Sequence, residues 1–95
     1  MISIIAPTAA AVSGVTTEFS PAGPFILHGS LFNGTESAKL ERLGPSGQYE
    51  TLTNSAGPVQ IGQAPNSIYV DLPAGTYRIN KTVTVTTASV GYEVV

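Results

Sequence analysis

Apolar and polar residues alternate along much of the chain in short runs, the pattern of β-strands with one face turned to a core. In SIYVDL (67–72) the apolar residues Ile68, Val70 and Leu72 are expected to point inward and the polar ones outward. In TYRIN (76–80), Tyr77 and Ile79 share one face. Turn residues lie before and between these two runs, so each is predicted to be a separate strand.

Another strand is predicted over FILHGSLF (25–32). Strict alternation divides this run into two faces, with Phe25, Leu27 and Leu31 on one and Ile26, His28, Ser30 and Phe32 on the other. The dipeptide Asn33-Gly34 then indicates a turn. Further strands are expected at 2–6, 11–19, 48–54, 59–62, 82–90 and 92–95.

Residues 36–44 (ESAKLERLG) fit two structures. A helix would have Thr35 as its N-cap, Leu40 and Leu43 on one face, and a stop at Gly44-Pro45. A strand would pair with 48–54 across the turn formed by residues 44–47. We favour the strand, because the helix would bury only two large residues and the Pro-Ser-Gly turn suits a hairpin.

These runs predict an all-β chain that forms a single antiparallel β-sandwich of seven to nine short strands, immunoglobulin-like or jelly-roll-like. With 95 residues the chain fits one small domain, with an expected radius of gyration of about 12 Å. We assign 21–95 to the sandwich and expect 1–20 to form an N-terminal strand or an extended arm. The apolar start lacks a basic region and is broken by Pro7, so no secretion signal is recognised.

Composition narrows the classes of function. Charged residues make up 11% of the chain, against ~25% in a typical domain, and 20 residues are Ser or Thr. A neutral, hydroxyl-rich surface is suited to contact with other proteins, because it costs less to remove from water than lysine or glutamate. The net charge of −2 and the scattered basic residues argue against nucleic-acid binding. Without cysteine there is no disulfide, thiolate or Cys zinc site, and no cofactor is expected.

The segment LPAGTY (72–77) resembles the tyrosine corner of immunoglobulin-like and fibronectin type III-like sandwiches, in which a tyrosine hydroxyl returns to the backbone a few residues upstream. The resemblance implies a structural corner formed by Leu72, Pro73, Gly75 and Tyr77. It implies nothing about activity, because sandwiches of this kind carry many unrelated functions.

The whole chain is also similar in composition to small bacteriophage virion proteins that decorate or cement capsids or form parts of tails. This resemblance implies a non-enzymatic structural protein located in the virion and assembled in the host cytoplasm. Its expected partners are further copies of the chain, as a homo-oligomer, and a larger protein assembly such as a capsid shell. No contact with nucleic acid or a membrane is expected.

The two ends of the chain are apolar, and apolar ends are either paired in a sheet or buried against a neighbour. The candidate interface residues at these ends are Ile2, Ile4, Ile5, Tyr92, Val94 and Val95. The run 82–90 is expected to be an edge strand whose hydroxyls defend it poorly against pairing with another chain. Both features are typical of a protein that works in an assembly.

Two alternatives compete with this hypothesis. A carbohydrate-binding or adhesin module would use an aromatic platform built from Phe32, Tyr49, Tyr69 and Tyr92. A hydrolase would need His28, the only histidine, beside Asp71, the only aspartate, and a serine, but no nucleophile motif accompanies them. The interpretation of His28 that we favour is a partly exposed residue on the outer face of a strand, with no catalytic or metal-ligating residue in the chain.

Overall fold

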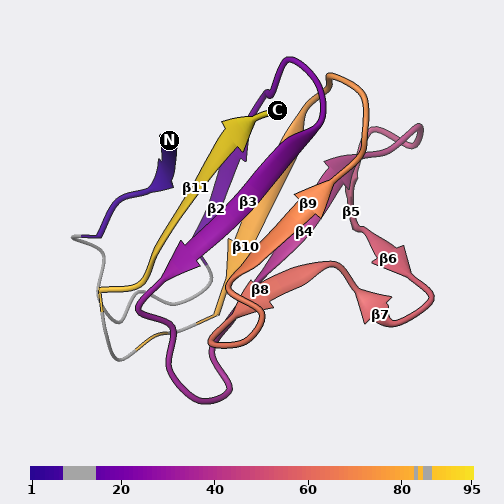
Figure 1. Ribbon diagram of the computed structural model, residues 1–95. Coiled ribbons are helices and arrows are strands. Elements are labelled where there is room, and N and C mark those ends of the chain that lie inside the picture. The colour runs from indigo at the N-terminus through magenta and orange to yellow at the C-terminus, as the bar shows by residue number, and fades with distance from the viewer. Residues whose placement is uncertain (8–14, 83, 85–86) are drawn as a thin grey trace.

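The computed structural model describes residues 1–7, 15–82, 84 and 87–95, and every regular element in this part of the chain is a strand (Figure 1). The strands are β1 (Ile2–Ile5), β2 (Val15–Phe19), β3 (Phe25–Ser30), β4 (Ser37–Leu43), β5 (Tyr49–Thr51), β6 (Thr53–Asn54), β7 (Gly57–Pro58), β8 (Gln60–Gly62), β9 (Ser67–Val70), β10 (Tyr77–Lys81) and β11 (Ser89–Val94). All pairings are antiparallel. The predicted all-β sandwich is therefore confirmed, with eleven strands in the described residues where seven to nine were expected.

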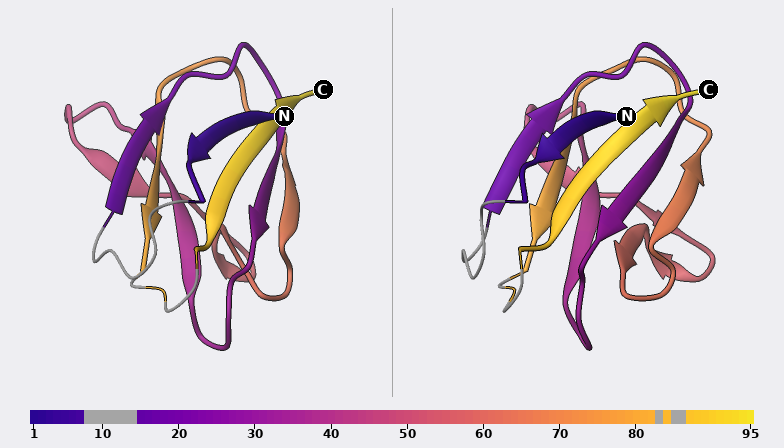
Figure 2. Two further views of the ribbon diagram at one scale, coloured as in Figure 1. Left: turned by 90° about the vertical axis from the view of Figure 1, so that its left-hand side faces the viewer. Right: turned by 60° about the vertical axis from the view of Figure 1, so that its left-hand side comes forward.

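Two sheets form the layers of the sandwich (Figure 2). Sheet A has the order β1-β11-β3-β9, and sheet B has the order β2-β10-β4, with β5 and β8 end to end along the far edge of β4. The radius of gyration, 12.4 Å, agrees with the value expected for a compact chain of this length. β1 and β9 are the two edges of sheet A.

The segment that also fitted a helix is the strand β4. It pairs with β10 along one side and with β5 and β8 along the other. Gly44 and Gln48 close the predicted hairpin turn, with the Gly44 N–H donating to the Gln48 carbonyl at 2.8 Å. Leu40 lies fully buried between the sheets, while Leu43 is exposed at the end of the strand. This segment is therefore a strand that is paired along both of its edges.

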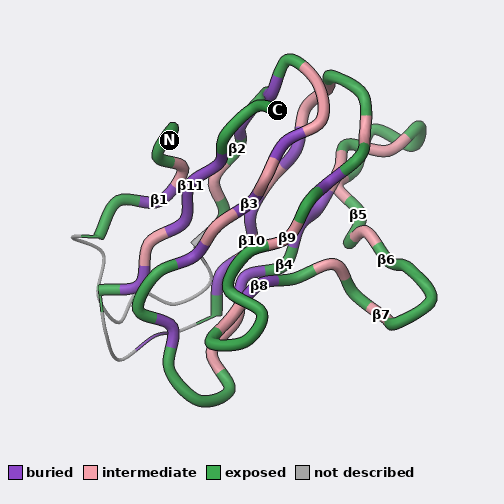
Figure 3. Tube along the Cα trace, in the orientation of Figure 1, coloured by how far each residue is buried: buried purple, intermediate pink, exposed green. Residues whose placement is uncertain are grey.

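Four aromatic rings fill one end of the core, and most buried positions lie on β3, β4, β10 and β11 (Figure 3). Phe19 and Tyr77 come from sheet B, and Phe25 and Tyr92 come from sheet A. The ring centroids of Phe19 and Phe25 lie 5.5 Å apart in an edge-to-face arrangement, and those of Phe19 and Tyr92 lie 5.0 Å apart. This cluster joins the two layers at one end.

The predicted alternation of 25–32 fails at its last two residues. Leu31, expected to point inward, is 63% exposed, and Phe32, expected to point outward, is buried. Leu31 has a φ of +63°, a conformation that ends the pleat and reverses the facing of the next side chain. Phe32 then covers Gly29, where a Cβ atom would lie 2.6 Å from the ring. Gly29 is thus the position that admits Phe32 to the core.

In the described part of the strand predicted at 82–90, only the last two residues, Ser89 and Val90, lie in a strand. Residues 82, 84, 87 and 88 belong to no strand, and β11 begins only at Ser89. β11 lies between β1 and β3, so it is an interior strand and no edge. β10 lies in sheet B and β11 lies in sheet A, so the chain changes sheets between these two strands. Val83 and Val85 of this run lie outside the described residues.

The first twenty residues contribute a strand to each sheet. β1 pairs with β11, and β2 pairs with β10. The predicted strand over 11–19 is present from Val15 onward, and its first four residues lie outside the described part of the chain.

The far edge of sheet B is split by a small hairpin. β5 and β8 both pair with β4, but residues 53–58 between them leave the sheet as the hairpin of β6 and β7. Leu52 and Val59 mark the branch point, since the Leu52 N–H donates to the Leu40 carbonyl and the Leu40 N–H donates to the Val59 carbonyl, both at 2.9 Å. This hairpin projects beyond the sandwich beneath β9 (Figure 1).

Candidate functional site

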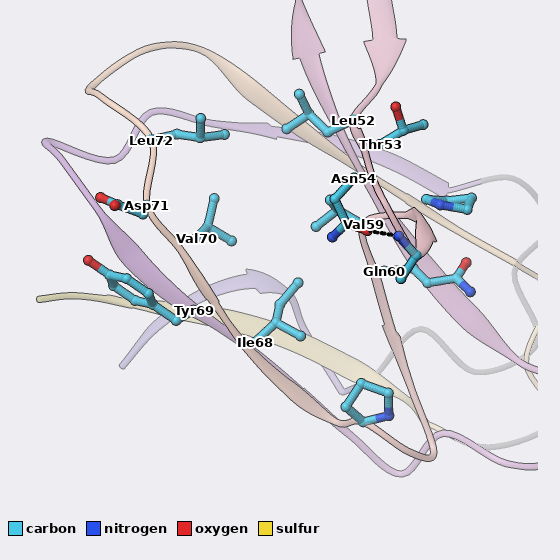
Figure 4. Close-up of a pocket in the computed structure, with 13 residues that line it drawn as sticks. Leu52, Thr53, Asn54, Val59, Gln60, Ile68, Tyr69, Val70, Asp71 and Leu72 are labelled. Carbon is cyan, nitrogen blue, oxygen red and sulfur yellow. Dashed lines mark hydrogen bonds between the residues drawn. The ribbon is translucent and has the colours of Figure 1, made fainter.

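A groove of about 670 Å³ opens between the edge strand β9 and the branch that carries the β6–β7 hairpin (Figure 4). One wall is β9 and the residues that follow it, and the other wall is the segment around Leu52 and Val59. The walls converge at the turn of 62–66, where the Gly62 N–H donates to the Pro65 carbonyl at 2.9 Å. The groove is therefore built where the chain passes from sheet B to sheet A.

Apolar side chains form the floor of this groove. Ile68, Val70 and Leu72 point into it from the β9 side, as the alternation of 67–72 predicts, and Leu52 and Val59 face them (Figure 4). Val70 is buried, while the other four are only half-buried. An apolar group that covers these half-buried side chains removes their remaining surface from water, which is favourable.

The pairing of β9 with β3 determines which backbone N–H and C=O groups of β9 point to its open edge. The Gly29 N–H of β3 donates to the Asn66 carbonyl at 2.8 Å, and the register continues with Leu27 opposite Ile68. Because alternate residues of an antiparallel strand turn their N–H and C=O groups to opposite edges, those of Tyr69 point away from β3. Among the described strands only β3 pairs with β9. The outer edge of β9 therefore offers a row of backbone donors and acceptors beside the apolar floor.

Tyr69 and Asp71 flank the groove on the outer face of sheet A (Figure 4). Tyr69 is 58% exposed and Asp71 is also exposed. Among the described residues that line the groove, Asp71 alone carries a charge. The rim is thus aromatic and acidic.

The sequence pattern did not predict the groove as a whole. It correctly placed Tyr69 outward and its two neighbours inward, but it gave the opposite wall no role. The only signal for that wall is the turn-rich stretch TNSAGP (53–58) between the apolar residues Leu52 and Val59, which indicates a small hairpin. Where that hairpin projects depends on the pairing of Leu52 and Val59 with β4, which is not local in sequence.

The structural corner lies next to the groove. The Tyr77 ring is fully buried, and its hydroxyl donates a hydrogen bond to the Pro73 carbonyl at 2.7 Å. Leu72 packs against the core from the strand end. Gly75 lies against the Tyr77 ring, and the Arg42 guanidinium stacks over that ring at 5.5 Å from its centroid. These contacts are structural, and they fix the direction in which the chain leaves β9.

The candidate interface residues at the chain ends divide into two groups. Ile5 and Tyr92 are buried, at 4% and 8% exposure, so the expectation that they form an interface is wrong. Tyr92 belongs to the aromatic cluster, because its position in β11 points inward. Ile4 is half-buried. The exposed apolar residues at these ends are Met1, Ile2, Val94 and Val95.

The aromatic platform expected for a sugar-binding module is not formed. Phe32 and Tyr92 are buried in the core. Tyr49 lies on β5 of sheet B, whereas Tyr69 lies on β9 of sheet A. Tyr69 is left as a single exposed ring, without the other three.

The described residues do not assemble a metal site. His28 is half-buried in the middle of β3, and no three His, Asp or Glu residues in the described part of the chain gather as a metal site would require. The described residues contain no helix that could span a membrane.

One polar cluster lies on the outer face of sheet B. Arg78 on β10 forms a salt bridge with Glu41 on β4 at 2.6 Å and stacks over the Tyr49 ring at 4.2 Å. The Tyr49 hydroxyl donates to the Glu18 carboxylate, and this hydrogen bond raises the pKa of Tyr49. These contacts link the four neighbouring strands β2, β10, β4 and β5, so we infer that the cluster stabilises the sheet.

Lys81 is the one lysine on an inward-facing position among the described residues. It is fully buried at the end of β10, and its Nζ donates to the Thr84 hydroxyl at 2.9 Å. Burial lowers the pKa of Lys81 from its usual 10.5, and attraction to the Glu36 carboxylate offsets part of that shift. The folded chain therefore holds this proton less tightly than the unfolded chain does.

Replacing Lys81 by methionine tests this burial. Since the unfolded chain binds more protons between the lowered pKa and 10.5, the Lys81 contribution to stability increases as the pH rises through that window. Lys81→Met should therefore have a higher free energy of unfolding than the wild type. This difference should be largest at neutral pH and shrink toward pH 10.5. Urea unfolding of both proteins at several pH values measures this difference. Both proteins contain Tyr49, so its contribution to the pH dependence cancels. A difference independent of pH would contradict a buried Lys81.

No protein-family model, curated protein or solved structure matches this chain. The most distinctive surface features of the described residues are the groove at the β9 edge and the exposed apolar residues at the two chain ends.

Proposed function

We propose that the chain is a non-enzymatic structural subunit that acts by protein–protein contact within a larger assembly, most specifically as a decoration or cement protein of a phage capsid. The observation that carries the proposal is the open β9 edge beside an apolar groove, a surface built to contact another chain. The low charge and the high content of serine and threonine support it, because such a surface costs little to remove from water.

Self-association is the second part of the proposal. Ile2 is the first residue of β1, and Met1 precedes it. Val94 is the last residue of the neighbouring β11, and Val95 follows it. All four are between 42% and 74% exposed. Both chain ends lie at the same end of the sandwich (Figures 1 and 2). Their burial between copies would contribute about 25 cal/mol per Å² of apolar area before the cost of association.

The sandwich subclass is part of the same proposal. The Tyr77–Pro73 hydrogen bond is the contact expected of an immunoglobulin-like tyrosine corner, and it supports that class over a jelly roll. The exposed Tyr69 is the one feature that favours the alternative of a glycan-binding or adhesin module. A glycan array with the purified chain tests that alternative, and retention of a defined glycan would favour it over the structural role.

Native mass spectrometry of the full chain tests self-association. We expect a discrete oligomer at micromolar concentration, and we expect Ile2→Ser together with Val94→Ser to return it to the monomer. Leu43→Ser, which also removes an exposed aliphatic side chain but lies on sheet B, is the matched control and should leave the oligomer unchanged. A wild-type chain that stays monomeric throughout would contradict this part of the proposal.

A further inference from the structure

We propose that the groove beside β9 binds an extended segment of the partner protein, which adds to sheet A as a strand and places a basic residue opposite Asp71. This inference rests on the proposed function, because it names the kind of partner that the assembly must supply. Four observations on the groove carry it.

The first observation is the backbone edge. The N–H and C=O groups of Tyr69 point out of sheet A at a position with no paired strand among the described residues. Such a row pairs with another extended chain, and in strand addition these main-chain bonds supply much of the affinity. A ligand that brings no backbone of its own, such as a small apolar molecule, would leave these groups unpaired.

The second observation is the contrast with the other edge of sheet A. β1 carries a break in register between Ser3 and Ile5, and a bulge of this kind protects an edge against further pairing. β9 is paired to β3 in unbroken register from Phe25–Val70 to His28–Ser67 and contains no proline, lysine or bulge. The described residues thus leave β9 as the edge of this sheet that is open to regular pairing.

The third observation is the apolar floor. A strand added beside β9 turns every second side chain toward Ile68, Val70 and Leu72, and the wall of Leu52 and Val59 lies opposite. The groove therefore selects a segment with apolar residues at alternate positions. A groove of about 670 Å³ has room for several such side chains.

The fourth observation is charge. Asp71 is the only charged residue among the described lining residues, and the chain as a whole carries −2. Side chains of the added strand that point outward lie next to Tyr69 and Asp71. Opposite charges across neighbouring strands are stabilising and like charges are destabilising, so the segment should carry lysine or arginine at the position opposite Asp71.

Selection from a library of random peptides of about nine residues, the length of a strand with short flanks, tests the inference with the purified full chain as bait. We expect enrichment of sequences with alternating apolar residues and one lysine or arginine. The best peptide should bind Asp71→Lys about tenfold more weakly, as expected when an attractive pair becomes a repulsive one. A second selection with Asp71→Lys should enrich aspartate or glutamate in place of the basic residue.

Two further variants make the test specific. Glu93→Lys, which makes the same change of charge on an exposed residue of the interior strand β11, is the matched control and should keep wild-type binding. Tyr69→Pro removes the outward N–H and should abolish binding. Circular dichroism checks that Tyr69→Pro folds. If Tyr69→Pro does not fold, Asp71→Lys still tests the site independently.

Other results would overturn the inference. These are the absence of any enriched pattern, peptides whose binding is indifferent to Asp71→Lys, or a wild-type homodimer that Tyr69→Pro dissociates, which would make a second copy the occupant. If the chain binds particles but selects no peptides, the inference fails and the proposed function stands. If it selects the expected peptides but binds no particle, the groove is a strand-binding site and the structural role in a capsid fails.

Discussion

Phe25→Ala is expected to lower the free energy of unfolding by about 3–5 kcal/mol, the usual cost of removing a buried phenylalanine. Phe25 is completely buried on β3, and its ring contacts Phe19, Tyr77 and Tyr92 with centroid distances of 5.5, 5.5 and 6.0 Å. Removing the ring therefore breaks contacts from both sheets at once. A small domain has a total stability of about 5–15 kcal/mol, so the variant should be close to unfolding at 37 °C.

Urea unfolding followed by circular dichroism measures this loss. Phe25→Leu, which keeps an apolar side chain, should lose less than Phe25→Ala, and Tyr69→Ala, which removes an exposed ring from β9, should change the stability by less than about 0.5 kcal/mol. A loss of less than 1 kcal/mol for Phe25→Ala would mean that the sheets are not joined through this cluster.

Tyr77→Phe should lower the free energy of unfolding by about 1–2 kcal/mol without altering any binding. The substitution keeps the buried ring and removes only the hydroxyl that donates to the Pro73 carbonyl at 2.7 Å. The expected cost is in the lower part of the range for an unpaired buried group, because Pro73 is exposed and water can reach its carbonyl.

The matched control for the hydroxyl is Tyr69→Phe, at an exposed tyrosine, which should leave the unfolding curve unchanged. If Tyr77→Phe and Tyr69→Phe proved equally stable, the hydrogen bond to Pro73 would have no structural role. A change in partner binding in Tyr77→Phe with intact stability would instead make the corner part of the functional surface.

The local pattern was sufficient to predict the fold class and the facing of several strands. SIYVDL and TYRIN alternate cleanly because one face of each strand is buried and the other is exposed, and the structure places Val70, Tyr77 and Ile79 inward. The turn of 44–47 between two β-prone segments was enough to decide for a hairpin over a helix. These are short-range signals, and they succeed where neighbouring residues determine the structure.

The failures have long-range causes. Leu31 breaks the alternation through a positive φ, which its identity as leucine gives no reason to expect. The described residues between Lys81 and Ser89 belong to no strand, and the chain changes sheets between β10 and β11. Tyr92 was expected at an interface but completes an aromatic cluster whose other members come from β2, β3 and β10.

The candidate site could be predicted only in part for the same reason. Tyr69 and Asp71 are recognisable as outward residues of one strand from sequence alone. That β9 is an edge follows from the order of strands in sheet A, and the groove beside it follows from the pairing of Leu52 and Val59 with Leu40. Neither relation is encoded within one segment of the chain.

Co-sedimentation with particles tests the proposed structural role most directly. The purified chain is mixed with capsids that lack it, prepared from the phage that the proposal assigns as its source, and the mixture is separated on a density gradient. We predict that the chain moves with the capsids and saturates at a fixed ratio to the shell subunit, and that excess soluble chain stays at the top. A chain that remains entirely at the top of the gradient at every concentration would contradict the role as a capsid protein.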